Sequence, residues 1–199
     1  MGIVINKITF KNYRQYGTGT MSFSTSGECM LSVFIAKNGT GKTTILNAIT
    51  WCLYGKELNL SDDKKALPVV TSAVVKDAAV GDTIQVEVAL TITDEDNVIE
   101  FKRAKEFRVN RDSSSNNRVL PGHDQLTVTT TKTGDFSNTE IKSGSDADII
   151  VKQYFDEAIF KFYFFDGEKL RDFFTASQAN SIQQSIFNIS QITLLENAC

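Results

Sequence analysis

The fold of this chain is decided by the stretch AKNGTGKTT at residues 36–44. The apolar run MLSVFIA at residues 30–36 leads into it, and apolar residues at helical spacing follow it over residues 43–54. This order predicts a strand buried on both faces, a glycine-rich loop and a helix that ends near Gly55. Small residues and a helix N-terminus let backbone N–H groups surround phosphate oxygens. The stretch therefore predicts a phosphate-binding loop of the Walker A type.

Three successive polar side chains at the end of this loop have expected roles in binding ATP with Mg²⁺. Lys42 would reach the β- and γ-phosphates, the Thr43 hydroxyl would be a Mg²⁺ ligand, and Thr44 would contact the α-phosphate. Ala36 stands where the motif has its first glycine, and its methyl group is small enough for the loop to form. The residues expected to bind nucleotide are Lys37, Asn38, Gly39, Thr40, Gly41, Lys42, Thr43 and Thr44.

A β-hairpin is predicted in the middle of the chain. Apolar and polar residues alternate over residues 83–93 and again over 98–107, and the stretch DEDN at residues 94–97 supplies turn residues. Residues 126–131 have the β-branched composition of another strand. We therefore expect an antiparallel β-subdomain over residues 83–135, followed by a helix that begins near Ser145.

Basic side chains gather on the second strand of this hairpin. Residues 101–118 carry a net charge of +4, whereas the whole chain of 199 residues carries −3. Two interpretations are open, a solvated hairpin edge and a contact with the DNA backbone. The candidates for DNA contact are Lys102, Arg103, Lys105, Arg108 and Arg111.

Composition narrows the class of protein. The chain is 41% hydrophobic and 23% charged, which is typical of a globular domain. It has no apolar run approaching ~20 residues, which excludes a membrane-spanning helix, and its start lacks the pattern of a signal peptide. Its three cysteines are odd in number and widely spaced, so they indicate neither a disulfide framework nor a zinc site. We expect a cytoplasmic protein.

The resemblance to a known family rests on three segments. Residues 36–55, AKNGTGKTTILNAITWCLYG, resemble the N-terminal lobe of SMC/SbcC-type ATPase heads of the ABC class, in which the loop contains Asn-Gly-x-Gly-Lys and the helix ends in Leu-Tyr-Gly. Residues 10–16, FKNYRQY, are similar to the family segment that places an arginine near bound nucleotide, which implies that role for Arg14. Residues 162–170, FYFFDGEKL, look most like DndD, the ATPase of bacterial DNA phosphorothioation, and the Lamassu-type anti-phage ATPases.

The resemblance implies an α/β P-loop NTPase fold with a mixed sheet around the loop helix plus the antiparallel β-subdomain. The ABC signature and a Walker B motif do not occur in this sequence, and in the family both lie in a C-terminal lobe beyond a coiled coil. Apolar residues at helical spacing run through residues 181–199 to the last position without a stop signal. We therefore expect the N-terminal half of a split head, with residues 1–180 as the ATPase lobe and 181–199 as the start of a helix leading to a coiled coil.

Asp166 follows an aromatic run and admits three interpretations. By position it matches the Q-loop of the family, where it would lie near the metal or the attacking water. It could instead be a variant Walker B acid, or part of a structural turn. In the first two interpretations Asp166 would act with Thr43 at Mg²⁺.

The implied function is that of the ATP-binding lobe of an SMC-like ATPase that couples head engagement to DNA processing in phosphorothioation or anti-phage defence. The implied partners are its own C-terminal lobe and coiled coil, a second head in an ATP-dependent homodimer, DNA, and other proteins of a DNA modification or defence system. Two alternatives are a nucleotide-gated structural or sensor module with negligible turnover, and an SbcC-type ATPase that works with a nuclease in double-strand-break repair. This chain alone is expected to show almost no ATPase activity.

Overall fold

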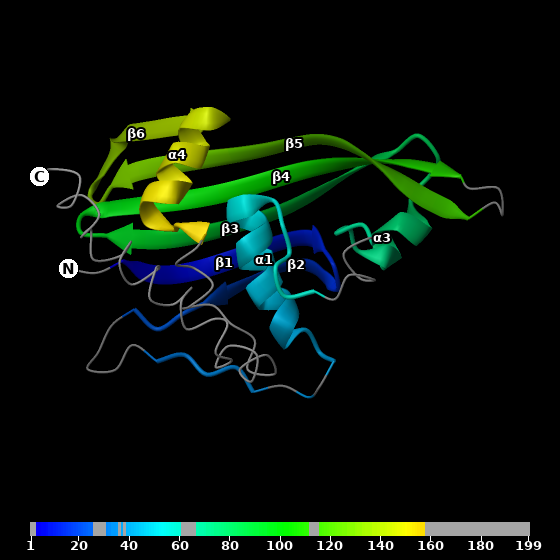
Figure 1. Ribbon diagram of the computed structural model, residues 1–199, viewed down its shortest axis with the longest axis horizontal. Helices are drawn as coiled ribbons and strands as arrows, with labels where there is room; N and C mark the ends of the chain where they lie inside the picture. The colour runs from blue at the N-terminus through cyan, green and yellow to red at the C-terminus, as the bar shows by residue number, and fades with distance from the viewer. Residues whose placement is uncertain are drawn as a thin grey trace, which may run out of the picture. The chain divides into compact units, whose positions relative to one another are not determined.

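The computed structural model describes residues 3–25, 31–35, 37, 39–60, 67–111 and 116–157 (Figure 1). The chain divides into two compact units, Met1–Val151 and Lys152–Cys199. Residues 162–170 and 181–199, on which three of the expectations above depend, lie outside the described residues, as do Ala36 and Asn38.

A single six-stranded sheet organises the described residues. Its strand order is β2-β1-β3-β4-β5-β6, and every neighbouring pair is antiparallel. The strands are β1 (Val4–Tyr13), β2 (Tyr16–Ser22), β3 (Thr83–Asp94), β4 (Asn97–Arg111), β5 (Asn117–Lys132) and β6 (Asp135–Ser143). The predicted hairpin is confirmed, because all of β3 pairs with β4, from Thr83 opposite Arg108 to Asp94 opposite Asn97.

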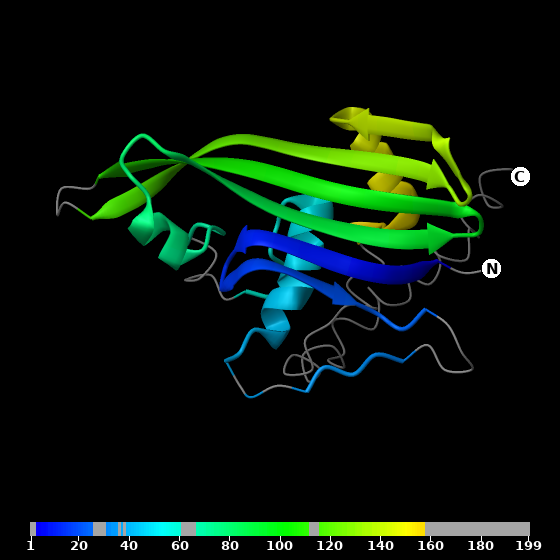
Figure 2. The same cartoon turned by 180° about the vertical axis from the view of Figure 1, so that it is seen from behind.

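The core lies between one face of this sheet and two helices, α1 (Lys42–Tyr54) and α4 (Ser145–Tyr154). Figure 1 shows both helices in front of the sheet, and Figure 2 shows the opposite face, which neither helix covers. Buried residues alternate along β4, since successive side chains of a strand point to opposite sides. In β3 every residue from Val88 to Ile92 is buried. The largest buried side chains include Tyr13, Leu53, Leu90, Ile92, Ile99 and Phe101.

Helix α1 begins and ends at glycines, as its sequence predicts. Gly41 is its N-cap, and Gly55 ends it in the left-handed conformation with φ 69°. The Gly55 N–H donates to the Trp51 carbonyl at 2.9 Å, which satisfies one of the last carbonyls of the helix. A short helix, α3 (Ser72–Asp77), follows later in the chain.

Two expectations about the sheet are wrong for the described residues. The sheet that carries α1 is antiparallel and not mixed. Residues 31–35 form no strand, and Leu31, Val33 and Ile35 are exposed. The physical reason is that a buried strand needs backbone partners beside it, and no strand of the described sheet pairs with residues 31–35.

Candidate nucleotide-binding site

The predicted phosphate-binding loop has the backbone that its glycines allow. Gly39 has φ 79° and Gly41 has φ 109°, values that residues with a side chain rarely adopt. The Lys37 carbonyl accepts hydrogen bonds from the Thr40 hydroxyl at 2.7 Å and the Thr40 N–H at 3.4 Å. The loop therefore closes on itself just before α1 begins.

Lys42, the first residue of α1, is exposed but folds back over this loop. Its Nζ donates to the Lys37 carbonyl oxygen at 3.0 Å. The ammonium group thus lies on the loop side of the helix N-terminus, where the positive end of the helix dipole also favours an anion. Thr43 and Thr44 follow as the next two residues of the helix. The arrangement is chemically suited to binding phosphate.

Gln15 and Tyr16 contact this loop, although sequence reasoning did not select them. The Tyr16 hydroxyl donates to the Gly41 carbonyl oxygen at 3.1 Å, and burial raises the pKa of that hydroxyl, which keeps it a donor. The Thr44 hydroxyl donates to Gln15 Oε1 at 3.2 Å. A Cβ added to Gly41 would lie 2.2 Å from Gln15 Nε2 and 2.7 Å from the Tyr16 hydroxyl oxygen. Their only sequence signal is that they adjoin Arg14.

Arg14 points away from the loop in this structure. Its Nη2 pairs with Glu57 Oε2, its Nε donates to Glu57 Oε1 at 3.0 Å, and its Nη1 donates to the Pro68 carbonyl at 3.3 Å. Burial opposes the charge of the guanidinium, but the hydrogen bonds and charge of Glu57 raise the pKa of Arg14. The expected contact between Arg14 and nucleotide stays a prediction, and here its donors hold the segment that follows α1.

Tyr13 completes this cluster. Its hydroxyl donates to Glu57 Oε1 at 2.6 Å, and burial together with the Glu57 charge raises its pKa far above the ordinary value. The Glu57 carboxylate therefore accepts hydrogen bonds from the neutral Tyr13 hydroxyl and from the Arg14 guanidinium.

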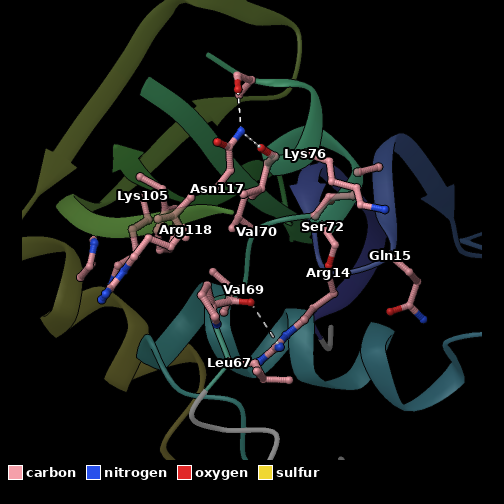
Figure 3. A pocket seen from close by; sticks show the side chains of 18 of the residues that line it. Arg14, Gln15, Leu67, Val69, Val70, Ser72, Lys76, Lys105, Asn117 and Arg118 are labelled. Carbon is pink, nitrogen blue, oxygen red and sulfur yellow. Dashed lines mark hydrogen bonds between the residues drawn. The ribbon is translucent and has the colours of Figure 1, made fainter. Parts of the chain in front are cut away.

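A cleft lies beside this cluster, and both Arg14 and Gln15 line it (Figure 3). Arg14 and Gln15 point in different directions in Figure 3. Asn117 donates to the carbonyls of Val75 at 2.9 Å and Ala78 at 2.7 Å, which ties β5 to α3. Basic residues from several elements line the cleft, and none of the described loop residues 37 and 39–44 does. Those basic residues are Arg14, Lys56, Lys76, Lys105, Arg111 and Arg118.

The basic residues of β4 do not share one surface. Arg103 and Lys105 pair with Val88 and Val86 of β3 and lie on the face that α1 covers, whereas Lys102 pairs with Ala89 and lies on the opposite face. Lys102 contacts Glu87 at 2.6 Å. Arg108 and Arg111, nearer the end of the strand, are exposed.

Arg103 has a structural role. Its Nε donates to the Cys52 carbonyl at 3.0 Å and its Nη2 to the Leu53 carbonyl at 3.4 Å, so it caps the C-terminal end of α1. Its Nη1 pairs with Asp124 at 2.9 Å, and Lys105 pairs with the same carboxylate at 3.0 Å. Burial opposes ionisation of Asp124, but the two cations lower its pKa.

The remaining candidate residues concern metal binding and thiol chemistry. Asp166 and Asn38 lie outside the described residues, so the Q-loop and metal roles of Asp166 stay predictions. Within the described part of the chain, no group of three metal-ligating His, Cys, Asp or Glu side chains is found. Cys52 is a buried free thiol whose pKa burial raises to about 12, as expected for an inert core cysteine.

No helix in the described residues has the length and hydropathy needed to cross a membrane.

Comparison with known protein families supports the assignment of the phosphate-binding loop. No curated protein matches the sequence. A family model described as an AAA domain, AAA_23, matches residues 7–198, which supports an SMC-type ATPase head lobe with a P-loop ATPase fold. Because that match spans nearly the whole chain, the chain belongs to the AAA_23 family of AAA domains.

Proposed function

We propose that this chain is the ATP–Mg²⁺-binding lobe of an SMC-like ATPase. The observation that carries the proposal is the loop that closes on the Lys37 carbonyl, with left-handed Gly39 and Gly41 and the Lys42 ammonium folded over it. Membership of the AAA_23 family supports ATP binding and ATPase activity in general.

The loop residues fit a magnesium nucleotide. Lys42 would neutralise phosphate charge, and the first N–H groups of α1 would donate to phosphate oxygens. The Thr43 hydroxyl would hold Mg²⁺, which when bound neutralises negative charge on the phosphates. The Thr44 hydroxyl, at the third helical position, would donate to the α-phosphate.

We propose further that the complete protein couples engagement of two such heads to DNA processing in phosphorothioation or anti-phage defence. The support is the resemblance of residues 162–170 to DndD and Lamassu-type ATPases. For DNA contact we favour Arg108 and Arg111 over Arg103, because the Arg103 donors are used on Cys52, Leu53 and Asp124. Lys102 and Lys105 each hold a carboxylate already.

Calorimetric titration with Mg-ATP tests nucleotide binding directly. Lys42→Ala removes the ammonium that faces the phosphates and should weaken binding about 10-fold or more, since a charge-assisted hydrogen bond contributes ~1.5–3 kcal/mol. The matched control is Lys11→Ala, because Lys11 is an exposed lysine whose ammonium pairs with Glu87 at 2.9 Å, away from the loop. Binding that is equal in wild type and Lys42→Ala would overturn the nucleotide-binding proposal.

A further inference from the structure

The strongest unassigned feature is the exposed Gln15 amide, which lies against the N-terminal end of α1. Gln15 is in the turn between β1 and β2, 29 positions from Thr44, yet its Oε1 accepts the Thr44 hydroxyl at 3.2 Å. Its Nε2 lies so close to Gly41 that a Cβ there would be 2.2 Å away. A side-chain amide is thus held at the mouth of the phosphate-binding loop.

The Thr44 side chain has a single hydrogen-bond donor to offer. A threonine hydroxyl has one O–H and two acceptor lone pairs. In this structure the O–H of Thr44 is used on Gln15 Oε1. It cannot donate to a phosphate at the same time. Rotating the Gln15 amide by half a turn exchanges Oε1 and Nε2, so that Nε2 donates to Thr44 Oγ1 and the Thr44 O–H is released.

We infer that Gln15 is a nucleotide-positioning residue, which turns the Thr44 hydroxyl toward the α-phosphate by donating to it from Nε2. This inference rests on the proposed nucleotide-binding function. The amide at position 15 can both accept from Thr44 in the empty loop and donate to it in the occupied one. A carboxylate accepts only, so it would retain the Thr44 O–H and repel the phosphates.

Tyr16 supports this geometry from the neighbouring position. Its hydroxyl donates to the Gly41 carbonyl at 3.1 Å, and its ring stacks on Phe10 with centroids 4.8 Å apart. The turn that carries Gln15 is therefore attached to the loop by a second contact, which limits how far the amide moves when it rotates.

Calorimetric titration with Mg-ADP and with Mg-ATP tests the inference. Gln15→Ala should weaken both nucleotides by the same factor, about 3- to 10-fold, as expected for one hydrogen bond. Gln15→Glu should weaken both by at least about 30-fold, because charge repulsion adds to the lost donor. Equal factors are expected because both nucleotides carry an α-phosphate. The matched control is Gln125→Ala, an exposed glutamine of β5, which should bind like the wild type.

A double-mutant cycle distinguishes positioning from a general effect on the loop. In a Thr44→Ala background, Gln15→Ala should weaken binding no further, since its effect passes through the Thr44 hydroxyl. Factors that multiply in the double variant would overturn the inference, and so would wild-type affinity in Gln15→Ala or an effect confined to ATP. If Lys42→Ala abolishes binding while the Gln15 variants bind normally, only the role of Gln15 fails. If Lys42→Ala binds normally, the proposed function fails.

Discussion

Arg14 and Glu57 form a two-pronged ion pair that ties the turn after β1 to the segment following α1, across 43 positions of sequence. Their side chains are only 14% and 6% exposed. The same turn contacts the phosphate-binding loop through Gln15 and Tyr16. One tight turn thus holds both ends of the loop helix.

Removing one partner of this pair should destabilise the fold. In Arg14→Leu, Glu57 keeps its charge in a mostly buried site, where the Tyr13 hydroxyl still donates to it. Removing one member of a buried pair costs ~3–5 kcal/mol. Urea unfolding of the wild type and the variant measures the difference in unfolding free energy. The control is Lys142→Ala, whose pair with Glu140 is exposed to solvent, so its loss should hardly change the free energy of unfolding. Similar losses in both variants would contradict the prediction.

Asp124 should make stability depend on pH. Its pKa is lowered in the folded chain by Lys105 and Arg103, so its contribution is fully present above the ordinary aspartate pKa of ~3.9 and is lost as pH falls through the lower folded value. The difference in unfolding free energy between wild type and Asp124→Asn should therefore be constant near neutral pH and shrink below about pH 4. Urea unfolding at several pH values checks this, and a difference that grows on acidification would contradict it.

Gly41→Ala should disable the loop. The backbone there has φ 109°, which residues with a side chain rarely adopt, and the added Cβ would force the ends of the Gln15 and Tyr16 side chains to shift. We expect a loss of ~1–3 kcal/mol in stability, and loss of nucleotide binding in the calorimeter. Gly17→Ala is the control, because nothing lies within 4 Å of a Cβ there and it should leave both measurements nearly unchanged.

DNA contact through the end of β4 should appear in the salt dependence of binding. Replacing Arg108 and Arg111 by alanine should lower the slope of log K against log salt by roughly 2, because fewer counterions are released. Binding of duplex DNA by the complete protein at several salt concentrations measures the slope. An unchanged slope would assign these two residues to a solvated edge.

The chain by itself should bind ATP and turn it over hardly at all. Positioned acids and signature residues are needed for hydrolysis, and the ABC signature and a Walker B motif do not occur in this sequence. A phosphate-release assay measures turnover. Robust activity that Lys42→Ala abolishes would assign a catalytic role to residues within this chain, with Asp166 the first to replace.

The sequence by itself determined the features that depend on near neighbours along the chain. The glycines at 39 and 41, the helix end at Gly55 and the alternating strands of the hairpin were all predictable, because backbone sterics and side-chain periodicity act over a few residues. The Walker A pattern likewise predicts a phosphate-binding loop at the N-terminal end of α1.

Only the tertiary structure decided which distant side chains meet. Strand register placed Arg103 beneath the end of α1, and the turn after β1 brought Gln15 to Thr44 and Arg14 to Glu57. The apolar run at residues 30–36 predicts a buried strand, yet the apolar side chains of its described residues 31–35 are exposed, because a strand also needs partners from elsewhere in the chain. Local patterns specify what an element can become, whereas hydrogen-bond partners and packing across the fold decide whether it does and what it touches.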